Sequence, residues 1–182
     1  MNIKLGLLPL SALLLSACIS QPDYRETSAD LPVVAAVDLD RYTGKWHEIA
    51  RYPNWFERGC VAAVAEYAKL PDGKISVTNS CTKEDGEIDV AEGKARVVEG
   101  SNGAKLKVKF APSWVPFAEG DYWVLHLEPD YSAVLVGEPR GQYLWILARD
   151  PAPPQATLDR ILKKAEDLGF ETEPLVYSGN PA

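Results

Sequence analysis

The chain has 182 residues, of which 46% are hydrophobic and 25% are charged, a balance typical of a globular protein. This length suits one domain with its own core. The formal net charge is −7, so a basic surface for nucleic acid is not expected. Two histidines and three cysteines leave few ligands for a metal, and we expect neither a metal nor a cofactor.

The first residues are typical of an export signal. Lys4 precedes an apolar run over residues 5–15, which is shorter than the roughly 20 residues that a membrane-spanning helix needs. The run ends in Leu15-Ser16-Ala17-Cys18, which resembles the lipobox of bacterial lipoproteins. This resemblance implies a lipoprotein signal peptide over residues 1–17 and an acylated Cys18 at the mature N-terminus. An ordinary cleavage site beside an accidental cysteine stays the alternative.

The lipobox resemblance also implies a location. Ile19, not aspartate, follows Cys18, which in Gram-negative lipoproteins favours the outer membrane. We expect a lipid anchor at Cys18 and a protein on the periplasmic face. Residues 18–37 have no clear period and are predicted to be a lipidated tether. The folded domain is expected over residues 38–178, with a tail over residues 179–182.

Strand signals recur from Lys45 onward. Residues 105–110 alternate between lysine and apolar side chains, and residues 75–79 alternate as well. Residues 122–127, 132–136 and 143–148 are rich in β-branched and aromatic side chains, with turn residues between the segments. About eight short strands between residues 45 and 149 predict an all-β sandwich or barrel.

One amphipathic helix is predicted near the C-terminus. Pro151, Pro153 and Pro154 end the sheet, and apolar residues from Leu158 to Leu168 then recur at helical spacing. Gly169 stands where a C-terminal cap belongs. We expect this helix to pack on the outer face of the strand over residues 143–148, and a short strand to follow at residues 175–177.

Several motifs then occur in an order that resembles the lipocalin family. Gly44-Lys45-Trp46 opens the first strand, Asp130-Tyr131 lies in a later turn, and Arg149 ends the eighth strand. The resemblance covers roughly residues 38–178 and is strongest to bacterial outer-membrane lipocalins and apolipoprotein D. It implies an eight-stranded antiparallel up-and-down β-barrel with one C-terminal helix packed outside.

The signature residues are expected to close the barrel at one end. Trp46 can fill the narrow end, and the guanidinium of Arg149 can stack on its indole and donate hydrogen bonds to nearby carbonyls. We assign this structural role to Gly44, Trp46, Asp130, Tyr131 and Arg149, and expect no catalytic residue.

Side-chain alternation, carried through the lipocalin match, predicts the wall of a ligand cavity. The inward residues are expected to be Ala63, Ala65, Tyr67, Ile75, Val77, Asn79, Ala95, Leu106, Val108, Phe110, Tyr122, Val124, His126, Val134, Val136, Tyr143 and Trp145. The resemblance implies a fatty acid or a lysophospholipid as ligand, with its polar head at the mouth near Tyr67, Tyr122, Trp114 or a basic residue. A core filled by its own side chains is the alternative. His126 is expected near the closed end, as a neutral side chain bonded to a neighbour such as Glu48.

Cys60 and Cys81 form an even pair in an oxidising compartment. A hairpin that pairs Tyr67 with Ile75 would place Cys60 opposite Thr82, and one bulge would bring the two sulfurs into range. We predict a Cys60–Cys81 disulfide. The alternative is a free Cys81 thiol inside the barrel.

These features favour a non-enzymatic carrier that stores or transports hydrophobic small molecules for envelope maintenance. One alternative is a lipocalin-fold enzyme acting on a lipophilic ligand. The other is a surface interaction or dimerisation module, which would use the apolar residues 114–117 (Trp-Val-Pro-Phe).

Overall fold

A computed structural model describes residues 21–25, 30–110 and 119–179. Cys18 and the apolar residues 114–117 lie outside this part of the chain, and their predicted roles stay predictions. The strands are β1 (Gly44–Arg51), β2 (Cys60–Lys69), β3 (Ile75–Lys83), β4 (Ile88–Val97), β5 (Lys105–Lys109), β6 (Glu119–Leu127), β7 (Ala133–Gly137), β8 (Leu144–Ala148) and β9 (Val176–Tyr177). The helices are α1 (Leu39–Tyr42) and α2 (Gln155–Asp167).

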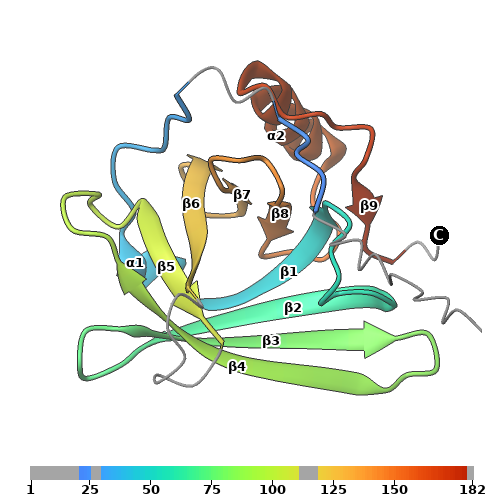
Figure 1. The fold of residues 1–182 in the computed structure, drawn as a ribbon, viewed down its shortest axis with the longest axis horizontal. Helices are drawn as coiled ribbons and strands as arrows, with labels where there is room; N and C mark the ends of the chain where they lie inside the picture. The colour runs from blue at the N-terminus through green and yellow to red at the C-terminus, as the bar shows by residue number, and fades with distance from the viewer. Residues whose placement is uncertain (1–20, 26–29, 111–118, 180–182) are drawn as a thin grey trace, which may run out of the picture.

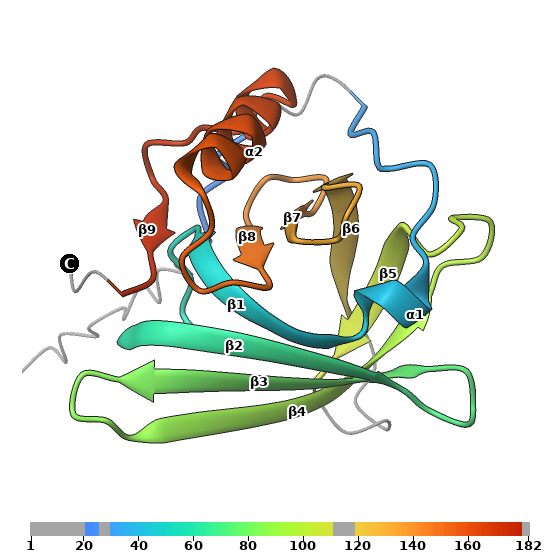
Figure 2. The same ribbon diagram turned by 180° about the vertical axis from the view of Figure 1, so that it is seen from behind.

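The strands form one closed antiparallel barrel, as predicted (Figures 1 and 2). Each strand from β2 to β7 pairs with the next along the chain, and β1 pairs with both β8 and β2. Closure leaves no free edge around the barrel itself. The ninth strand, β9, pairs with Ala50 and Arg51 at the C-terminal end of β1 and extends the sheet there.

The barrel wall separates two hydrophobic clusters. The inner cluster surrounds Trp46 and includes apolar side chains from most of the strands. The outer cluster lies between α2 and the outer faces of β1, β7 and β8, and contains Leu135, Ile146 and Ile161. Strands β7 and β8 are apolar on both faces because they contribute to both clusters. The predicted position of the C-terminal helix is therefore confirmed, and Gly169 ends it with a φ of +84°.

The β2–β3 hairpin forms with a register two residues away from the expected one. Tyr67 pairs with Val77, and Lys69 pairs with Ile75, so that the loop spans residues 70–74. Backbone hydrogen bonds between Leu70 and Lys74 and between Gly73 and Leu70 close this loop. A shift of two residues leaves the inward and outward faces unchanged, because side chains alternate with a period of two.

Much of the segment expected to be a tether packs on the barrel instead. Tyr24 donates a backbone hydrogen bond to Gly141, and the buried Arg25 donates through Nε to the carbonyl of Leu168. Farther along, the amide of Val34 bonds to Val124, and the amide of Val37 bonds to Asn102. The described residues before α1 thus cross the outside of the barrel (Figure 1). Residues 21–179 contain the strands of the barrel and both clusters, and so carry the interactions that stabilise the fold.

Candidate functional site

The barrel encloses a cavity of about 700 Å³, within the usual range for small-molecule sites. The cavity wall is mostly apolar toward one end of the barrel and carries aromatic and acidic side chains toward the other end. The lining residues are Glu48, Trp55, Phe56, Glu57, Ala63, Val64, Ala65, Tyr67, Val77, Asn79, Val108, Phe110, Glu119, Gly120, Asp121, Tyr122, Glu138, Tyr143, Trp145 and Leu147. The interior is therefore not filled by its own side chains.

The closed end is built as the signature predicts. Trp46 is fully buried, and its indole Nε1 donates to the carbonyl of Tyr42 at 2.8 Å. The guanidinium carbon of Arg149 lies 3.8 Å from the centre of the Trp46 ring. The Arg149 nitrogens also donate to the carbonyls of residues 41, 42, 43 and 45, at 2.6–3.0 Å.

The remaining signature residues shape the backbone around this end. Gly44 has a φ of +93°, and an added Cβ would lie 3.4 Å from Arg149 Nη1. Asp130 accepts the amide of Ser132, and the Tyr131 hydroxyl accepts the amide of Asp38. These contacts are structural, and none of the groups faces the cavity.

Three tyrosine hydroxyls meet toward the closed end; Tyr67 and Tyr122 line the cavity, and Tyr42 lies beyond them beside a smaller void. The Tyr122 hydroxyl lies 2.7 Å from the hydroxyl of Tyr42 and 3.2 Å from that of Tyr67. Burial raises the pKa of Tyr67 to about 12 and moves the pKa of Tyr42 and Tyr122 well above 10. Tyr67 and Tyr122 were expected to meet a polar head at the mouth. The structure places them toward the closed end instead, because Tyr67 pairs with Gly44 at the start of β1.

Aromatic rings line the opposite end of the cavity. The centre of the Phe56 ring lies 5.8 Å from that of Tyr143 and 6.4 Å from that of Trp145. Tyr143 and Trp145 stack on each other, and Trp55 meets Phe56 edge-on. Trp55 and Phe56 are 72% and 45% exposed, which places them at the open rim. We call these four residues the aromatic wall.

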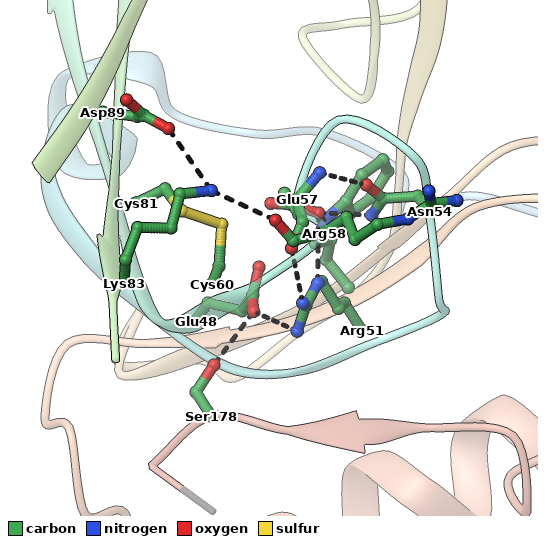
Figure 3. The surroundings of a disulfide bond; sticks show 11 residues. Glu48, Arg51, Asn54, Glu57, Arg58, Cys60, Cys81, Lys83, Asp89 and Ser178 are labelled. Carbon is green, nitrogen blue, oxygen red and sulfur yellow. Dashed lines mark hydrogen bonds and ion pairs between the residues drawn. A yellow bond between two sulfur atoms is a disulfide. The ribbon is translucent and has the colours of Figure 1, made fainter. Parts of the chain in front are cut away.

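Beside the aromatic wall, two carboxylates share one guanidinium. Figure 3 shows the two carboxylates and the guanidinium between them. Arg51 Nη1 lies 3.2 Å from Glu48 Oε1, and Arg51 Nε lies 3.4 Å from Glu57 Oε2. Ser178 and Asn54 donate to Glu48 and Glu57, respectively, and Trp145 Nε1 donates to Glu57 at 3.3 Å. We call Glu48, Arg51 and Glu57 the acidic triad.

Burial and the charge of Glu57 raise the pKa of Glu48 to about 8, although Arg51 acts in the opposite direction. The triad therefore holds a proton near neutral pH.

The predicted disulfide is confirmed. Cys60 and Cys81 are bonded, and a bulge between Cys60 and Ala62 adjusts the pairing of β2 with β3. The bond lies beside the acidic triad, close to the Lys83–Asp89 ion pair (Figure 3). The alternative of a free Cys81 thiol inside the barrel is excluded.

All the residues predicted to face inward except His126 fall into three groups. Those lining the main cavity are Ala63, Ala65, Tyr67, Val77, Asn79, Val108, Phe110, Tyr122, Tyr143 and Trp145. Ile75, Ala95 and Leu106 line a small void nearer the closed end. Val124, Val134 and Val136 belong to the inner cluster but border neither space. Phe110 follows the last residue of β5 and is 46% exposed, so it lies at the rim.

His126 is the exception, since it lies outside the barrel. A bulge between Val124 and His126 reverses the alternation, so that His126 pairs with Leu135 of the outer cluster. Its Nε2 lies 3.1 Å from Glu128, which also pairs with Arg160 of α2. The expected bond between His126 and Glu48 is therefore wrong.

The acidic triad and two residues of the aromatic wall were not predicted as lining. Alternation along β1 could have found Glu48, which lies two residues after the inward Trp46. Trp55, Phe56 and Glu57 belong to the β1–β2 loop, where no period applies, and only the fold brings them to the cavity.

Comparisons with known proteins agree with this architecture. Residues 37–179 match a family model described as a lipocalin-like domain. The chain is 38% identical over 170 residues to an outer membrane lipoprotein, Blc, of Vibrio cholerae, covering 92% of this chain and 94% of that protein. It is 37% identical over 136 residues to apolipoprotein D of Macaca fascicularis, covering 70% and 69% of the two chains.

The solved structure of insecticyanin from Manduca sexta has the same fold. It superposes with a TM-score of 0.67 at 22% identity, over 84% of this chain and 86% of insecticyanin. With the matched domain covering most of the chain, this protein belongs to the lipocalin family.

Proposed function

We propose that this protein is a membrane-tethered, non-enzymatic carrier of single-chain hydrophobic molecules, of the class of fatty acids and lysophospholipids. The observation that carries the proposal is the cavity of about 700 Å³, closed at one end by Trp46 and Arg149 and open at the other. Each methylene that leaves water for such a wall contributes about 0.8 kcal/mol. A chain of roughly 16 carbons therefore has a large gross driving force before entropy costs.

The tether and its location rest on separate support. The lipobox-like sequence ends at Cys18, and relatives over nearly the whole chain are outer membrane lipoproteins. We propose the same anchoring here, with the barrel on the periplasmic face of the outer membrane and a role in maintaining envelope lipids.

The test uses the protein from Gln21 onward, exported to an oxidising compartment so that the disulfide forms. Native mass spectrometry should find a co-purified lipid. A fluorescent fatty acid should bind saturably and be displaced by a lysophospholipid with a stoichiometry of one. A folded protein that shows neither bound lipid nor saturable displacement would overturn the carrier function.

A further inference from the structure

The charges that face the cavity are all of one sign. Five carboxylates line it, from Glu48, Glu57, Glu119, Asp121 and Glu138. Among the described residues, no lysine, arginine or histidine lines the same space. Residues 111–118 add no charge, because their sequence (Ala-Pro-Ser-Trp-Val-Pro-Phe-Ala) has no ionisable side chain. An anionic head group would therefore meet carboxylates with no cation facing it.

Three of the five carboxylates have their partners within the protein: two pair with cations and one accepts backbone amides. Glu119 forms an ion pair with Arg96 at 2.7 Å, and Asp121 forms one with Lys107 at 2.7 Å. Glu138 accepts backbone amides of its own turn, from Arg140, Gln142 and Tyr143. Glu119 and Asp121 are therefore paired with cations, whereas Glu138 is held by three backbone N–H groups and forms no ion pair within the part of the chain that the structure describes.

The acidic triad is different because it has two carboxylates and one guanidinium. Glu48 and Arg51 are 6% and 5% exposed, and the Glu57 side chain is 14% exposed, so bulk water screens the two carboxylates only weakly. The other contacts to the two carboxylates come from the neutral groups of Ser178, Asn54 and Trp145. The triad can therefore be balanced by a proton or by one further cation.

The aromatic wall lies directly against the triad. Trp145 donates its indole N–H to Glu57, and the same ring stacks on Tyr143 and contacts Phe56. Aromatic faces attract cations, and alkylammonium groups most readily lose water to them. Deeper in the cavity, the Asn79 Oδ1 atom is buried and finds no donor among the described residues. It is one more acceptor in a space that offers few donors.

We propose that the open end of the cavity is a site for an alkylammonium group, held by the aromatic wall and the acidic triad. Resting on the carrier function, the proposal names its preferred ligands as single-chain amphiphiles with an ammonium head. Fatty acids, whose head is a carboxylate, bind more weakly than their chain length alone would give. The Glu48 and Glu57 carboxylates act as specificity determinants.

The test compares three probes of equal chain length on the protein from Gln21 onward. Dodecyltrimethylammonium, dodecanol and laurate displace a neutral fluorescent probe at pH 8.5. The two ionic probes are kept below their critical micelle concentrations and dodecanol below its solubility limit. Dodecyltrimethylammonium should bind at least about tenfold more tightly than laurate, with dodecanol between them. Laurate binding as tightly as the ammonium probe, or more tightly, would overturn the proposal and leave the carrier function intact. No binding of any probe would instead contradict the carrier function.

Two variants locate the site. Glu48→Gln with Glu57→Gln leaves Arg51 as the only charge of the triad, and the preference should then reverse in favour of laurate. Phe56→Leu keeps an apolar group at an exposed position. It should weaken the ammonium probe about three- to tenfold while the ratio of laurate to dodecanol stays constant.

Glu84→Gln is the matched control, since it removes an exposed carboxylate from the β3–β4 turn outside the cavity. It should leave all three affinities unchanged. Dodecanol binding reports whether each variant is folded. If the double variant fails to fold, Phe56→Leu decides, and an unchanged preference for the ammonium probe in that variant would overturn the proposed site.

Discussion

Glu48 couples the cavity to pH. Its pKa is raised from 4.5 to about 8 by burial and by the charge of Glu57, while Arg51 and Ser178 lower it. In the unfolded chain the same carboxyl ionises near pH 4.5. Between these two values the folded protein binds a proton that the unfolded protein has lost, so the free energy of unfolding falls as pH rises.

Replacing the Glu48 carboxyl should make the free energy of unfolding depend less on pH. Wild-type protein is expected to lose stability between pH 5 and pH 8, by at most about 1.4 kcal/mol per pH unit for one proton. Glu48→Gln keeps the shape and loses the titration, so it should raise the free energy of unfolding relative to wild type more at pH 8 than at pH 5. Urea titrations at both pH values measure the effect. An identical pH dependence in the two proteins would show that Glu48 ionises normally.

Residue-scale prediction succeeded where a residue's role follows from local chemistry, and failed where it depends on packing. Trp46 and Arg149 carry a recognisable pattern, and their stacking forms as expected. His126 was placed on the wrong face because one bulge, invisible in the sequence, reverses the alternation along β6. The position of Glu57 in the cavity could not be predicted, because Glu57 lies in the β1–β2 loop, where side chains do not alternate. Only the path of this loop in the folded barrel brings it to the cavity.

Among the elements, the β2–β3 hairpin carries the covalent link of the barrel. The disulfide joins Cys60 at the start of β2 to Cys81 near the end of β3, 21 residues apart. Both cysteines lie at the open end, next to the loop that supplies Phe56 and Glu57. The disulfide therefore fixes the end of the β1–β2 loop to β3 at the open rim, which this loop lines.

Removing the disulfide should lower stability and loosen the rim. Cys60→Ala with Cys81→Ala is expected to cost about 3 kcal/mol of unfolding free energy for a loop of this length. Affinity for a bound amphiphile should fall as well, because the β1–β2 loop is then less constrained. Guanidinium unfolding and probe titration measure the two effects. A loss of stability with unchanged affinity would show that the disulfide stabilises the fold but does not affect ligand binding.

Element-scale prediction worked for periodic segments and failed for irregular ones. Strands and the helix α2 were found because alternation and helical spacing are written into single segments. Residues 21–25 and 30–37 have no period, and their order comes from backbone bonds to Gly141, Val124 and Asn102. Such contacts depend on the finished barrel, so the segment looked like a free tether.

For the whole molecule, the position of Gln21 brings the open rim of the cavity close in sequence to Cys18, the proposed site of acylation. Gln21 donates to the carbonyl of Pro53, two residues before the exposed Trp55 at the open rim. Cys18 precedes Gln21 by three residues, which span at most about 10 Å. An acyl chain on Cys18 would hold the mouth of the barrel within that reach of the lipid surface, so ligands could exchange without crossing much water.

Lengthening the tether should therefore slow lipid exchange without changing affinity. A flexible Gly/Ser insertion of about 20 residues between Ile19 and Ser20 would let the mouth move roughly 25 Å from the anchor. Uptake of a fluorescent lysophospholipid from vesicles by the lipidated protein should slow several-fold, because encounters between the mouth and the bilayer become rarer. The same insertion appended after Ala182 is the matched control and should leave the rate unchanged. Equal rates for all three proteins would mean that ligands reach the cavity through water, with the anchor setting only the compartment.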